Sequence, residues 1–412
     1  MTSSRMSWAW VPVLVVLGCG RSSEKEPATF AGKADTATAA QGSTAFALDL
    51  YGRLRSGREN LFLSPLSIST ALSMTYAGAR GETAREMASV LRLPEDQDAA
   101  HEQVGEILQQ LEAVGKAKGC RLDVANALWG QQDASFLPEF LSLIKDKYGG
   151  GMERVDFSKA EEARRTINAW VEKKTEGKIK DLIPPGMLRI ETGLVLTNAV
   201  YFKADWAMPF DKKRTTDAPF IMPGDRKVNV PMMRRTAELR YMESKDLQAL
   251  ELPYAGDTLS MVILLPGKAD GLNALENSLT PGDLDGWLKS LDERLVDVWL
   301  PRFTTTMWFE LSEVLKEMGM PSAFSLGSAD FSGMTGARGL FIGNVVHKAF
   351  VDVNEEGTEA AAATAVHMPT AAPPGPSPRP VVFKADHPFF FLIRDVKTGS
   401  ILFMGRVVNP KE

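Results

Sequence analysis

The side chains that perform most enzyme chemistry are scarce in this chain. Its 412 residues include four histidines and two cysteines, namely His101, His347, His367, His387, Cys19 and Cys120. The histidines stand in four unrelated contexts, so the spacing typical of metal ligands is absent. The nucleophile motif Gly-x-Ser-x-Gly and glycine-rich phosphate loops are absent as well. We therefore expect neither an enzyme nor a metal or cofactor, and we assign no function to Cys120.

A low-complexity region near the C-terminus is the strongest candidate for a functional segment. Residues 359–365 read EAAAATA, and residues 369–380 read PTAAPPGPSPRP, with six prolines in twelve residues. The second stretch is typical of an exposed, extended polyproline-like chain. Hydrophobic runs with strand character flank the region, and long loops inside a folded domain tend to be functional. The sequence therefore predicts an exposed functional loop.

The first part of this loop keeps its charges on one side of an extended chain. The even-numbered positions from 358 to 368 are Thr, Ala, Ala, Thr, Val and Met, whereas the odd-numbered positions hold Glu359 and His367. Because strand side chains alternate between faces, the even set suits burial in a sheet and the odd set suits solvent. A flexible Ala-rich linker is the alternative, and it would have no reason to keep its charges on one parity.

The elements that must position this loop fall into two groups. Apolar residues recurring four apart predict a helix from Ala45 to Leu54, and Pro65 predicts the start of a second helix that ends near Tyr76. The other predicted helices are 82–91, 99–114, 137–147 and 160–174, and the predicted strands are 121–129, 194–202, 247–252, 259–265, 295–300, 340–353, 389–393 and 401–407. Helices followed by strands, with little βαβ alternation, predict an α+β fold.

Bulk composition agrees with a single folded domain. Hydrophobic residues make up 44% of the chain and charged residues 24%, as in ordinary globular proteins. The net charge of −5 gives no electrostatic reason to expect nucleic acid as a partner. The sequence has no repeat and no internal linker, and large single domains reach this length.

The N-terminus has the pattern of an export signal. The stretch from Trp8 to Leu17 is uncharged and largely apolar, and it is too short for a permanent membrane helix. It ends in Val-Leu-Gly-Cys19, which resembles the lipobox of bacterial lipoproteins, where the cysteine carries a diacylglycerol. We expect a signal peptide over 1–18, lipidation of Cys19, and a flexible tether over 19–43 that can bury little apolar area.

This interpretation predicts an exported protein that is lipid-anchored to the cell envelope or cell surface. It leaves open which membrane leaflet carries the anchor. A plain secretory leader with an incidental Cys19 is the alternative.

Short motifs spread along the chain resemble those of one protein family, the serpins. In chain order they are Asn60–Ile68 (NLFLSPLSI), Thr175–Ile179 (TEGKI), Thr197–Lys203 (TNAVYFK) followed by Trp206, Ala329–Met334 (ADFSGM), His347–Ala349 (HKA) and Phe383–Ile393 (FKADHPFFFLI). The resemblance spans residues 44 to 409, and the motifs together are highly specific. It implies a monomeric serpin domain over 44–412, with helices around a large, mostly antiparallel main sheet, further sheets and an exposed reactive-centre loop over 355–380.

The resemblance also implies a mechanism, because one segment resembles the hinge of inhibitory serpins. The hinge consists of Glu355, Glu356, Gly357, Thr358, Glu359, Ala360, Ala361, Ala362 and Ala363. In that family a serine or cysteine protease cleaves the loop, and the freed hinge inserts into the main sheet as a new strand. The acyl-linked protease is dragged along and deformed, which implies a suicide-substrate inhibitor whose partner is the target protease.

Further residues match functional positions of the family. Ser64, Ser67, Asn198 and His347 match the "shutter", whose hydrogen bonds hold the central strands together. Trp206 matches the "breach", where insertion begins. A satisfied core histidine and plain core packing are the alternatives for His347 and Trp206. A heparin-type basic face is not expected, since the predicted fourth helix, if it extends from Ala99 to Lys118, has only Lys116 and Lys118 at its end.

Counting along the loop predicts where a protease cuts. Fourteen residues beyond Gly357 lies Ala371, which makes Ala371–Ala372 the expected scissile bond. Thr370–Ala371 is the alternative, because most proteases cleave poorly before proline. Small residues here indicate an elastase-like or subtilisin-like target. The stretch from this bond to Pro388 is longer than in many serpins, so the register stays open by one or two residues.

Two other functions fit the same fold. One is a non-inhibitory serpin that acts as a binding module, although such relatives often carry bulky or charged hinge residues. The other is a lipoprotein that serves as protease bait. A covalent complex with a protease separates inhibition from both.

Overall fold

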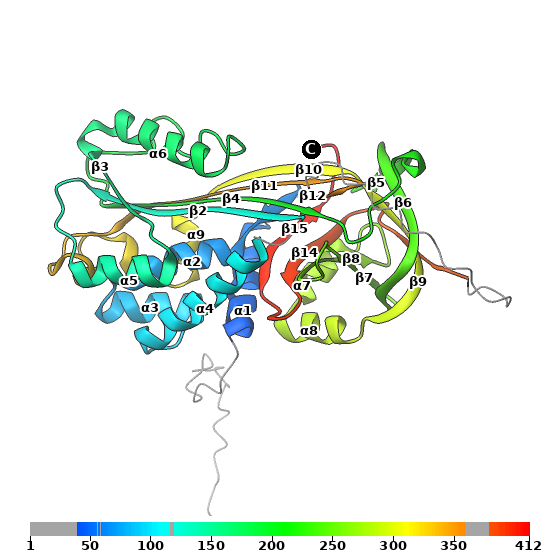
Figure 1. The fold of residues 1–412 in the computed structure, drawn as a ribbon, viewed down its shortest axis with the longest axis horizontal. Coiled ribbons are helices and arrows are strands. Elements are labelled where there is room, and N and C mark those ends of the chain that lie inside the picture. Colours follow the sequence, from blue (N-terminus) through cyan, green and yellow to red (C-terminus); the bar gives the residue numbers. More distant parts are fainter. Residues whose placement is uncertain (1–38, 56, 58, 116–118, 359–378) are drawn as a thin grey trace, which may run out of the picture. The chain divides into compact units, whose positions relative to one another are not determined.

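The computed structural model describes residues 39–412 except 56, 58, 116–118 and 359–378 (Figure 1). Cys19, the hinge residues after Thr358 and the expected scissile bond lie outside the described residues. The described residues belong to one unit that begins at Thr38.

The helices cover both faces of a long sheet. Their bounds are α1 Ala39–Leu54, α2 Pro65–Tyr76, α3 Gly81–Leu91, α4 Gln97–Gly115, α5 Pro138–Tyr148, α6 Ala160–Lys174, α7 Leu272–Ser278, α8 Pro281–Lys289, α9 Ser312–Met318 and α10 Ser332–Thr335. Helices α2 to α5 lie on one face of the sheet, and α6 lies on the other (Figure 1). None of the described helices is long and apolar enough to cross a bilayer.

The long sheet has six strands in the order β10-β11-β12-β4-β2-β3. Their bounds are β2 Cys120–Gln131, β3 Met152–Val155, β4 Leu194–Asp205, β10 Phe303–Glu310, β11 Ile342–Val353 and β12 Gly357–Thr358. The central strands β4 and β11 run parallel to each other, whereas β2 and β10 pair with them in the antiparallel sense. The start of the predicted loop therefore lies inside this sheet, as β12.

A second sheet has nine strands. Its path is β1-β15-β14-β8-β7-β6-β9-β13, and β5 pairs with β6. The bounds are β1 Leu61–Leu63, β5 Thr216–Met222, β6 Arg226–Glu243, β7 Leu247–Pro253, β8 Leu259–Pro266, β9 Asp292–Pro301, β13 Val381–Lys384, β14 Phe389–Asp395 and β15 Ile401–Val407. Strand β13 follows the loop, so the two ends of the loop are attached to different sheets.

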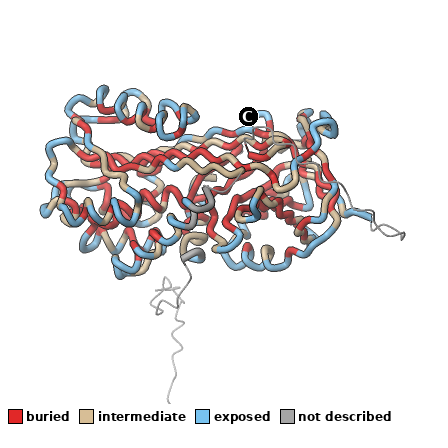
Figure 2. The backbone as a smooth tube through the Cα atoms, in the orientation of Figure 1, coloured by how far each residue is buried: buried red, intermediate tan, exposed pale blue. Residues whose placement is uncertain are grey.

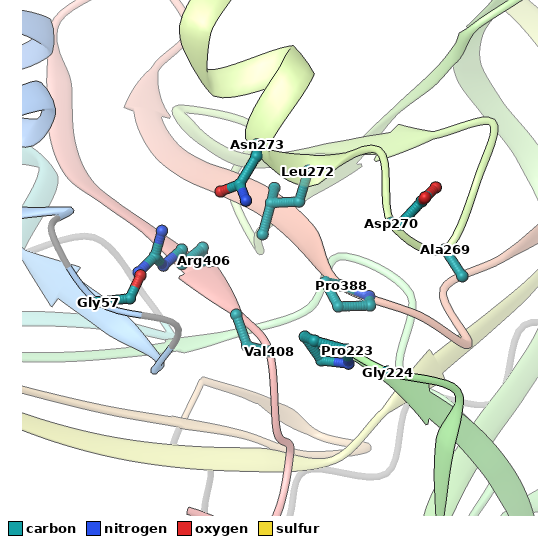
Figure 3. A pocket seen from close by; sticks show the side chains of 10 residues that line it. All are labelled: Gly57, Pro223, Gly224, Ala269, Asp270, Leu272, Asn273, Pro388, Arg406 and Val408. Atoms are coloured by element: carbon teal, nitrogen blue, oxygen red, sulfur yellow. The ribbon is translucent and has the colours of Figure 1, made fainter.

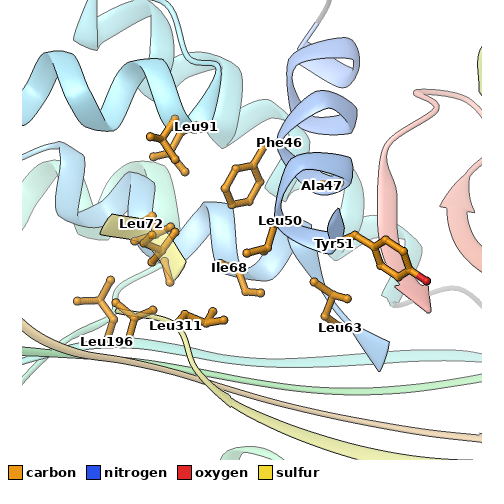
Figure 4. Packing of buried hydrophobic residues seen from close by; sticks show 14 of the residues in the cluster. Phe46, Ala47, Leu50, Tyr51, Leu63, Ile68, Leu72, Leu91, Leu196 and Leu311 are labelled. Atoms are coloured by element: carbon orange, nitrogen blue, oxygen red, sulfur yellow. The ribbon is translucent and has the colours of Figure 1, made fainter. Parts of the chain in front are cut away.

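Buried residues follow the strands and the inner faces of the helices (Figure 2). Helix α2 lies at the centre of the core, and nearly all of its side chains are buried. Ser64 caps its N-terminus, and Pro65 is its first residue. The Ser64 side chain accepts a hydrogen bond from the Ser67 backbone N–H at 3.3 Å, and proline fits the first helical turn. Leu72 on α2 and Leu196 on β4 belong to one hydrophobic core (Figure 4).

The structure corrects the expected start of the first helix. Helix α1 begins at Ala39 rather than Ala45, so the last residues of the expected tether 19–43 are helical. Small residues precede Phe46 and Leu50, and these two side chains are fully buried in the core. Burial of this apolar side is what holds the helix in place.

Candidate functional site

The two central strands of the six-stranded sheet are paired along only part of their length. Eight residue pairs join β4 to β11, from Leu194 opposite Ile342 to Tyr201 opposite Phe350. Beyond the last pair, β12 lies between the two strands. The sheet is thus closed at one end and already admits a short strand at the other.

Thr358 occupies the opening between the two strands. It lies opposite Ala204 of β4 and opposite Val353 of β11. Its side chain is 0% exposed, and its hydroxyl shares a hydrogen bond of 2.8 Å with the Tyr254 hydroxyl. The structure therefore places Thr358, the first residue of the even-numbered set 358–368, on the buried face.

Gly357 is required by a close approach of two backbones. A Cβ atom at this position would lie 2.0 Å from the carbonyl oxygen of Ala204. Real Cβ atoms do not approach backbone that closely, so any side chain here would push β12 out of its pairing. The glycine of the hinge thus lets the chain turn into the sheet.

Trp206 contacts the turn at the start of the hinge. Its ring stacks on Tyr254 with 4.6 Å between centroids and 7° between planes. Its indole N–H donates to the Asn354 carbonyl at 3.0 Å, and its backbone N–H donates to the Glu356 carbonyl at 2.8 Å. The expected breach residue therefore binds the loop directly, in addition to packing in the core.

Glu355 is a buried carboxylate at the start of the hinge. Its side chain is bound by the Arg302 guanidinium, whose Nε donates at 2.8 Å, and by the Thr215 hydroxyl at 2.5 Å. Burial acts to raise the pKa of Glu355, but these hydrogen bonds outweigh burial and lower the pKa below its usual value. The neighbouring Glu356 pairs with Lys212 at 2.6 Å. Glu355 and Glu356 are therefore both held by cations.

His347 and Asn198 form the link across the β4–β11 boundary. They are direct partners in the parallel register. The Ser64 backbone N–H donates to His347 Nε2 at 3.2 Å, so Nδ1 carries the proton and donates to the Asn198 side-chain oxygen. Complete burial lowers the pKa of His347 to about 3. The imidazole is therefore neutral, as this hydrogen-bond pattern requires.

The other shutter residues complete a network that ties α2 to three strands. Asn198 Nδ2 donates to Ser67 Oγ at 2.6 Å and to the side-chain oxygen of Asn126. Ser67 Oγ in turn donates to Asn126 Oδ1 at 2.9 Å. Ser64 Oγ donates to the Leu402 carbonyl at 2.7 Å. The structure thus brings the four expected residues together, and it adds Asn126, which the sequence analysis missed.

The structure leaves part of the expected site undescribed. Outside the described residues lie Glu359, Ala360, Ala361, Ala362, Ala363, Thr370, Ala371, Ala372 and Cys19. Cys120 is partly buried, and burial together with the Asp205 charge raises the pKa of its thiol to about 11. Among the described residues, no group of three or more His, Cys, Asp or Glu side chains is arranged to hold a metal ion.

One cavity is lined by residues outside the hinge, the shutter and the breach. It has a volume of about 240 Å³ and is lined partly by Gly57, Pro223 and Arg406 (Figure 3). The Arg406 side chain is 3% exposed and already donates to Glu276 at 3.2 Å. The cavity includes no hinge, shutter or breach residue, so we do not assign it to the site.

The six-stranded main sheet already holds the start of its own loop, as β12 between β11 and β4. The family model described as "Serpin (serine protease inhibitor)" matches residues 41–410, and the chain belongs to the serpin family. Members of this family are protease inhibitors rather than enzymes, and the expected fold is confirmed.

Relatives and solved structures agree with this assignment. An uncharacterised serpin-like protein of Thermococcus kodakarensis is 46% identical over 368 residues, covering 89% of this chain and 84% of that protein. Human leukocyte elastase inhibitor is 43% identical over 381 residues, which cover 89% of this chain and 98% of that protein. Uncleaved ovalbumin superposes with a TM-score of 0.81 at 32% identity, and the match covers 90% of this chain and 100% of that chain. Human thyroxine-binding globulin in complex with thyroxine superposes with a TM-score of 0.81 at 31% identity, and the match covers 91% of this chain and 99% of that chain.

Proposed function

We propose that this serpin inhibits serine proteases, and cysteine proteases by the same route, as a suicide substrate. The protease nucleophile attacks the Ala371 carbonyl carbon, the bond to the Ala372 nitrogen breaks, and the new amine leaves with a proton. Residues 359–371 then enter the sheet while the acyl bond still links Ala371 to the protease. The observation that carries this proposal is the position of Thr358, which is buried between β4 and β11 with the loop continuing beyond it.

The register of β12 sets the path of insertion. Thr358 lies opposite Ala204, so each later residue would pair one residue earlier on β4. On that path Thr364 arrives between Asn198 and His347, whose mutual hydrogen bond it must replace. Even-numbered residues would stay on the buried face with Thr358. Insertion therefore requires the eight β4–β11 pairs to separate. The absence of charge at the even-numbered positions supports burial of that side of the inserted strand.

The chemistry of the loop supports an elastase-like or subtilisin-like target. Thr370, Ala371 and Ala372 are small residues that such proteases accept, and prolines protect the neighbouring bonds. A relative that covers most of this chain carries the name leukocyte elastase inhibitor, which agrees with this choice. Ala371–Ala372 is the bond we favour, with Thr370–Ala371 as the alternative.

A gel assay with protease tests the proposal directly. The protein is incubated with an elastase-like and a subtilisin-like serine protease, and the products are denatured and separated. We expect a covalent species at the summed mass less the released C-terminal fragment, which begins at Ala372. Protease whose catalytic serine is blocked is the control and should form no complex. Complete cleavage without a complex would instead mean bait or a non-inhibitory serpin.

Export and lipid anchoring complete the proposal. The apolar leader and the Val-Leu-Gly-Cys19 motif support removal of residues 1–18 and lipidation of Cys19, with the folded domain outside the cytoplasm. Mass spectrometry of the mature N-terminus should find a diacylglyceryl group on Cys19. The Cys19→Ser variant should lose it and leave the membrane fraction. An unmodified cysteine in the mature wild-type chain would refute anchoring without affecting inhibition.

A carrier function is the second candidate, because thyroxine-binding globulin has the same fold. A cavity of about 670 Å³ beside Arg240, Leu288 and Arg394 is in the size range of small-molecule sites. A protein that bound a fluorescent hydrophobic probe there and was cleaved by proteases without forming a complex would favour this candidate over inhibition.

A further inference from the structure

Tyr201 and Phe350 contact each other across the boundary that insertion must open. They are the last of the eight residue pairs between β4 and β11, at the end next to β12. Their rings stack with 6.4 Å between centroids and 25° between planes, and Tyr201 is 3% exposed. An aromatic pair attracts beyond the area that it buries. The two halves of the sheet are therefore joined by a ring contact beside the opening that β12 enters.

This ring pair lies on the face of the sheet opposite to the shutter. Adjacent residues of a strand face opposite sides, and Tyr201 lies three positions from Asn198 on β4. Ala199, which shares the parity of Tyr201, packs in one hydrophobic core with Ile167 and Val171 of α6. The boundary is thus fastened on both faces, by the shutter on the side of α2 and by the ring pair on the side of α6.

Other contacts of Tyr201 come from β2 and from the segment after α6. The Arg121 guanidinium of β2 lies 5.9 Å from the centre of the Tyr201 ring, and the Lys178 ammonium lies 5.3 Å from it. Arg121 is held in turn by Asp123 at 2.7 Å. Because β2 is paired with β4, the contact with Arg121 stays with β4 when β11 moves away. The ring contact with Phe350, in contrast, crosses the boundary and must break.

The register of β12 puts the ring pair first on the path of insertion. Counted three residues on from Thr358 along either neighbour of β12, Ala361 would arrive between Tyr201 and Phe350. The two residues before it would enter beyond the last β4–β11 pair. The shutter link between Asn198 and His347 lies three pairs further along. The entering chain therefore meets the ring pair before it meets the shutter.

We propose that Tyr201 and Phe350 are positioning residues whose ring contact is a latch that limits the rate of loop insertion. A strand inserted between β4 and β11 moves them from about 4.8 Å apart to about 10 Å apart, which takes the two rings out of contact. The latch thus stabilises the uncut form and is lost after insertion. Because its rings separate before the shutter opens, their contact also contributes to the barrier. This inference rests on the proposed function.

A double-mutant cycle in uncut and loop-cut protein tests the latch. The variants are Tyr201→Leu, Phe350→Leu and their combination, and all thermal midpoints are measured at one concentration of guanidinium chloride. In the uncut form the combined shift should fall short of the sum of the single shifts by at least about 1 °C. In the cut form the shifts should add. The control is the ring pair Phe136 and Phe140, which has the same 6.4 Å separation at 30° and should couple equally in both forms.

The latch also predicts a faster insertion step when it is removed. A fluorescent dye on Glu359→Cys, in a background of Cys19→Ser and Cys120→Ala, reports entry of the loop after a protease cut. Phe350→Leu should shorten the half-time of the signal at least about threefold. Tyr201→Phe keeps the ring and should leave the half-time unchanged.

Two results would overturn the inference. One is a coupling of the Tyr201 and Phe350 variants that is equal, or equally absent, in the uncut and cut forms, and the other is an unchanged half-time for Phe350→Leu. If a leucine variant does not fold, Tyr201→Met or Phe350→Met replaces it with the same expected results. If the wild-type protein forms no covalent complex, the proposed function fails, whereas the midpoint cycle still decides the role of the ring pair. A covalent complex together with equal coupling in both forms would refute the latch alone.

Discussion

At the level of single residues, the position of Thr358 determines what the loop tolerates. The side chain is fully buried and bonded to Tyr254 before any protease has acted. A charged side chain here would lose its hydration without gaining a partner, at a cost of several kcal/mol. Glu359, the next residue, is on the solvent parity and carries a charge in the natural sequence.

We therefore predict that Thr358→Arg converts the inhibitor into a substrate. Arginine would not fit the buried position between β4 and β11 from which insertion continues, so the protease would hydrolyse the acyl bond and leave. Denaturing gels should show cleaved protein and at least about tenfold less covalent complex, since about 1.4 kcal/mol already corresponds to tenfold in a rate. Glu359→Arg is the matched control and should still trap protease. Undiminished complex with Thr358→Arg would show that the hinge is assigned wrongly.

Two buried histidines make the protein sensitive to acid. His101 is 2% exposed and contacts the Tyr148 hydroxyl at 2.6 Å, and burial lowers its pKa to about 4. Burial lowers the pKa of His347 further, to about 3. In the unfolded chain both side chains titrate near 6.5, so below that pH the unfolded state binds more protons. Their contribution to stability is then fully present above about pH 6.5 and is lost as the pH falls toward 4 for His101 and toward 3 for His347.

We predict that His101→Gln reduces this acid sensitivity. Because folded His101 stays mostly neutral while the unfolded side chain is protonated, the free energy of unfolding is about 2 kcal/mol lower at pH 4.5 than at pH 7.5. Thermal unfolding at the two pH values should show a smaller difference for the variant than for the wild-type protein. The same difference in both proteins would mean that His101 does not titrate as its burial indicates.

At the level of elements, the β4–β11 boundary is where the sheet must open. Val200 and Ala349 are direct partners across it and belong to the same hydrophobic core. Neighbouring strands are about 4.8 Å apart, which is within the Cα separation that a disulfide spans. A covalent bond at this point would keep the boundary closed below Thr358.

We predict that the pair Val200→Cys and Ala349→Cys, in a Cys120→Ala background, blocks inhibition when oxidised. The loop should then be cleaved without complex formation, and a reducing agent should restore trapping. The single variant Val200→Cys in the same background is the control and should behave alike with and without reducing agent. Full inhibition by the oxidised pair would contradict insertion between β4 and β11.

The sequence predicts those helices and strands whose pattern lies within their own residues, and it misses those that depend on pairing with distant parts of the chain. Helix α2 begins and ends as expected, because Pro65 and an apolar pattern mark it within its own residues. Strand β6 was missed, since Pro231 and the pair Arg234–Arg235 interrupt its alternation. Its regularity comes from pairing with β9 along ten residues, which no local pattern records.

The same limit applies to the candidate site. The resemblance supplied Ser64, Ser67, Asn198 and His347, which the structure brings together. Asn126 was missed, although it lies in the expected strand 121–129. Its place in the network depends on the pairing register, which puts it opposite Asn198. Arg302 and Thr215, which bind Glu355, lie far from the hinge in the chain, so their contact follows from the tertiary fold alone.

At the level of the whole molecule, the proposed function requires an uncleaved fold that is less stable than the cleaved one. If the register of β12 continues, residues 359–368 would pair with both β4 and β11, and the eight existing pairs between those strands would be exchanged. The net gain is about a dozen ladder hydrogen bonds, or roughly 12 kcal/mol at ~1 kcal/mol each. This is comparable to the stability of a whole domain, so the closed form persists for kinetic reasons.

The most direct measurement is the thermal midpoint of the protein before and after a single cut in the loop. A gain of this size in a domain of this length predicts that the cut form unfolds about 15 °C higher or more. The cut is made with a protease that does not become trapped, and mass spectrometry locates it between residues 366 and 379. A midpoint that is unchanged or lower after the cut would contradict stored free energy and, with it, the proposed mechanism.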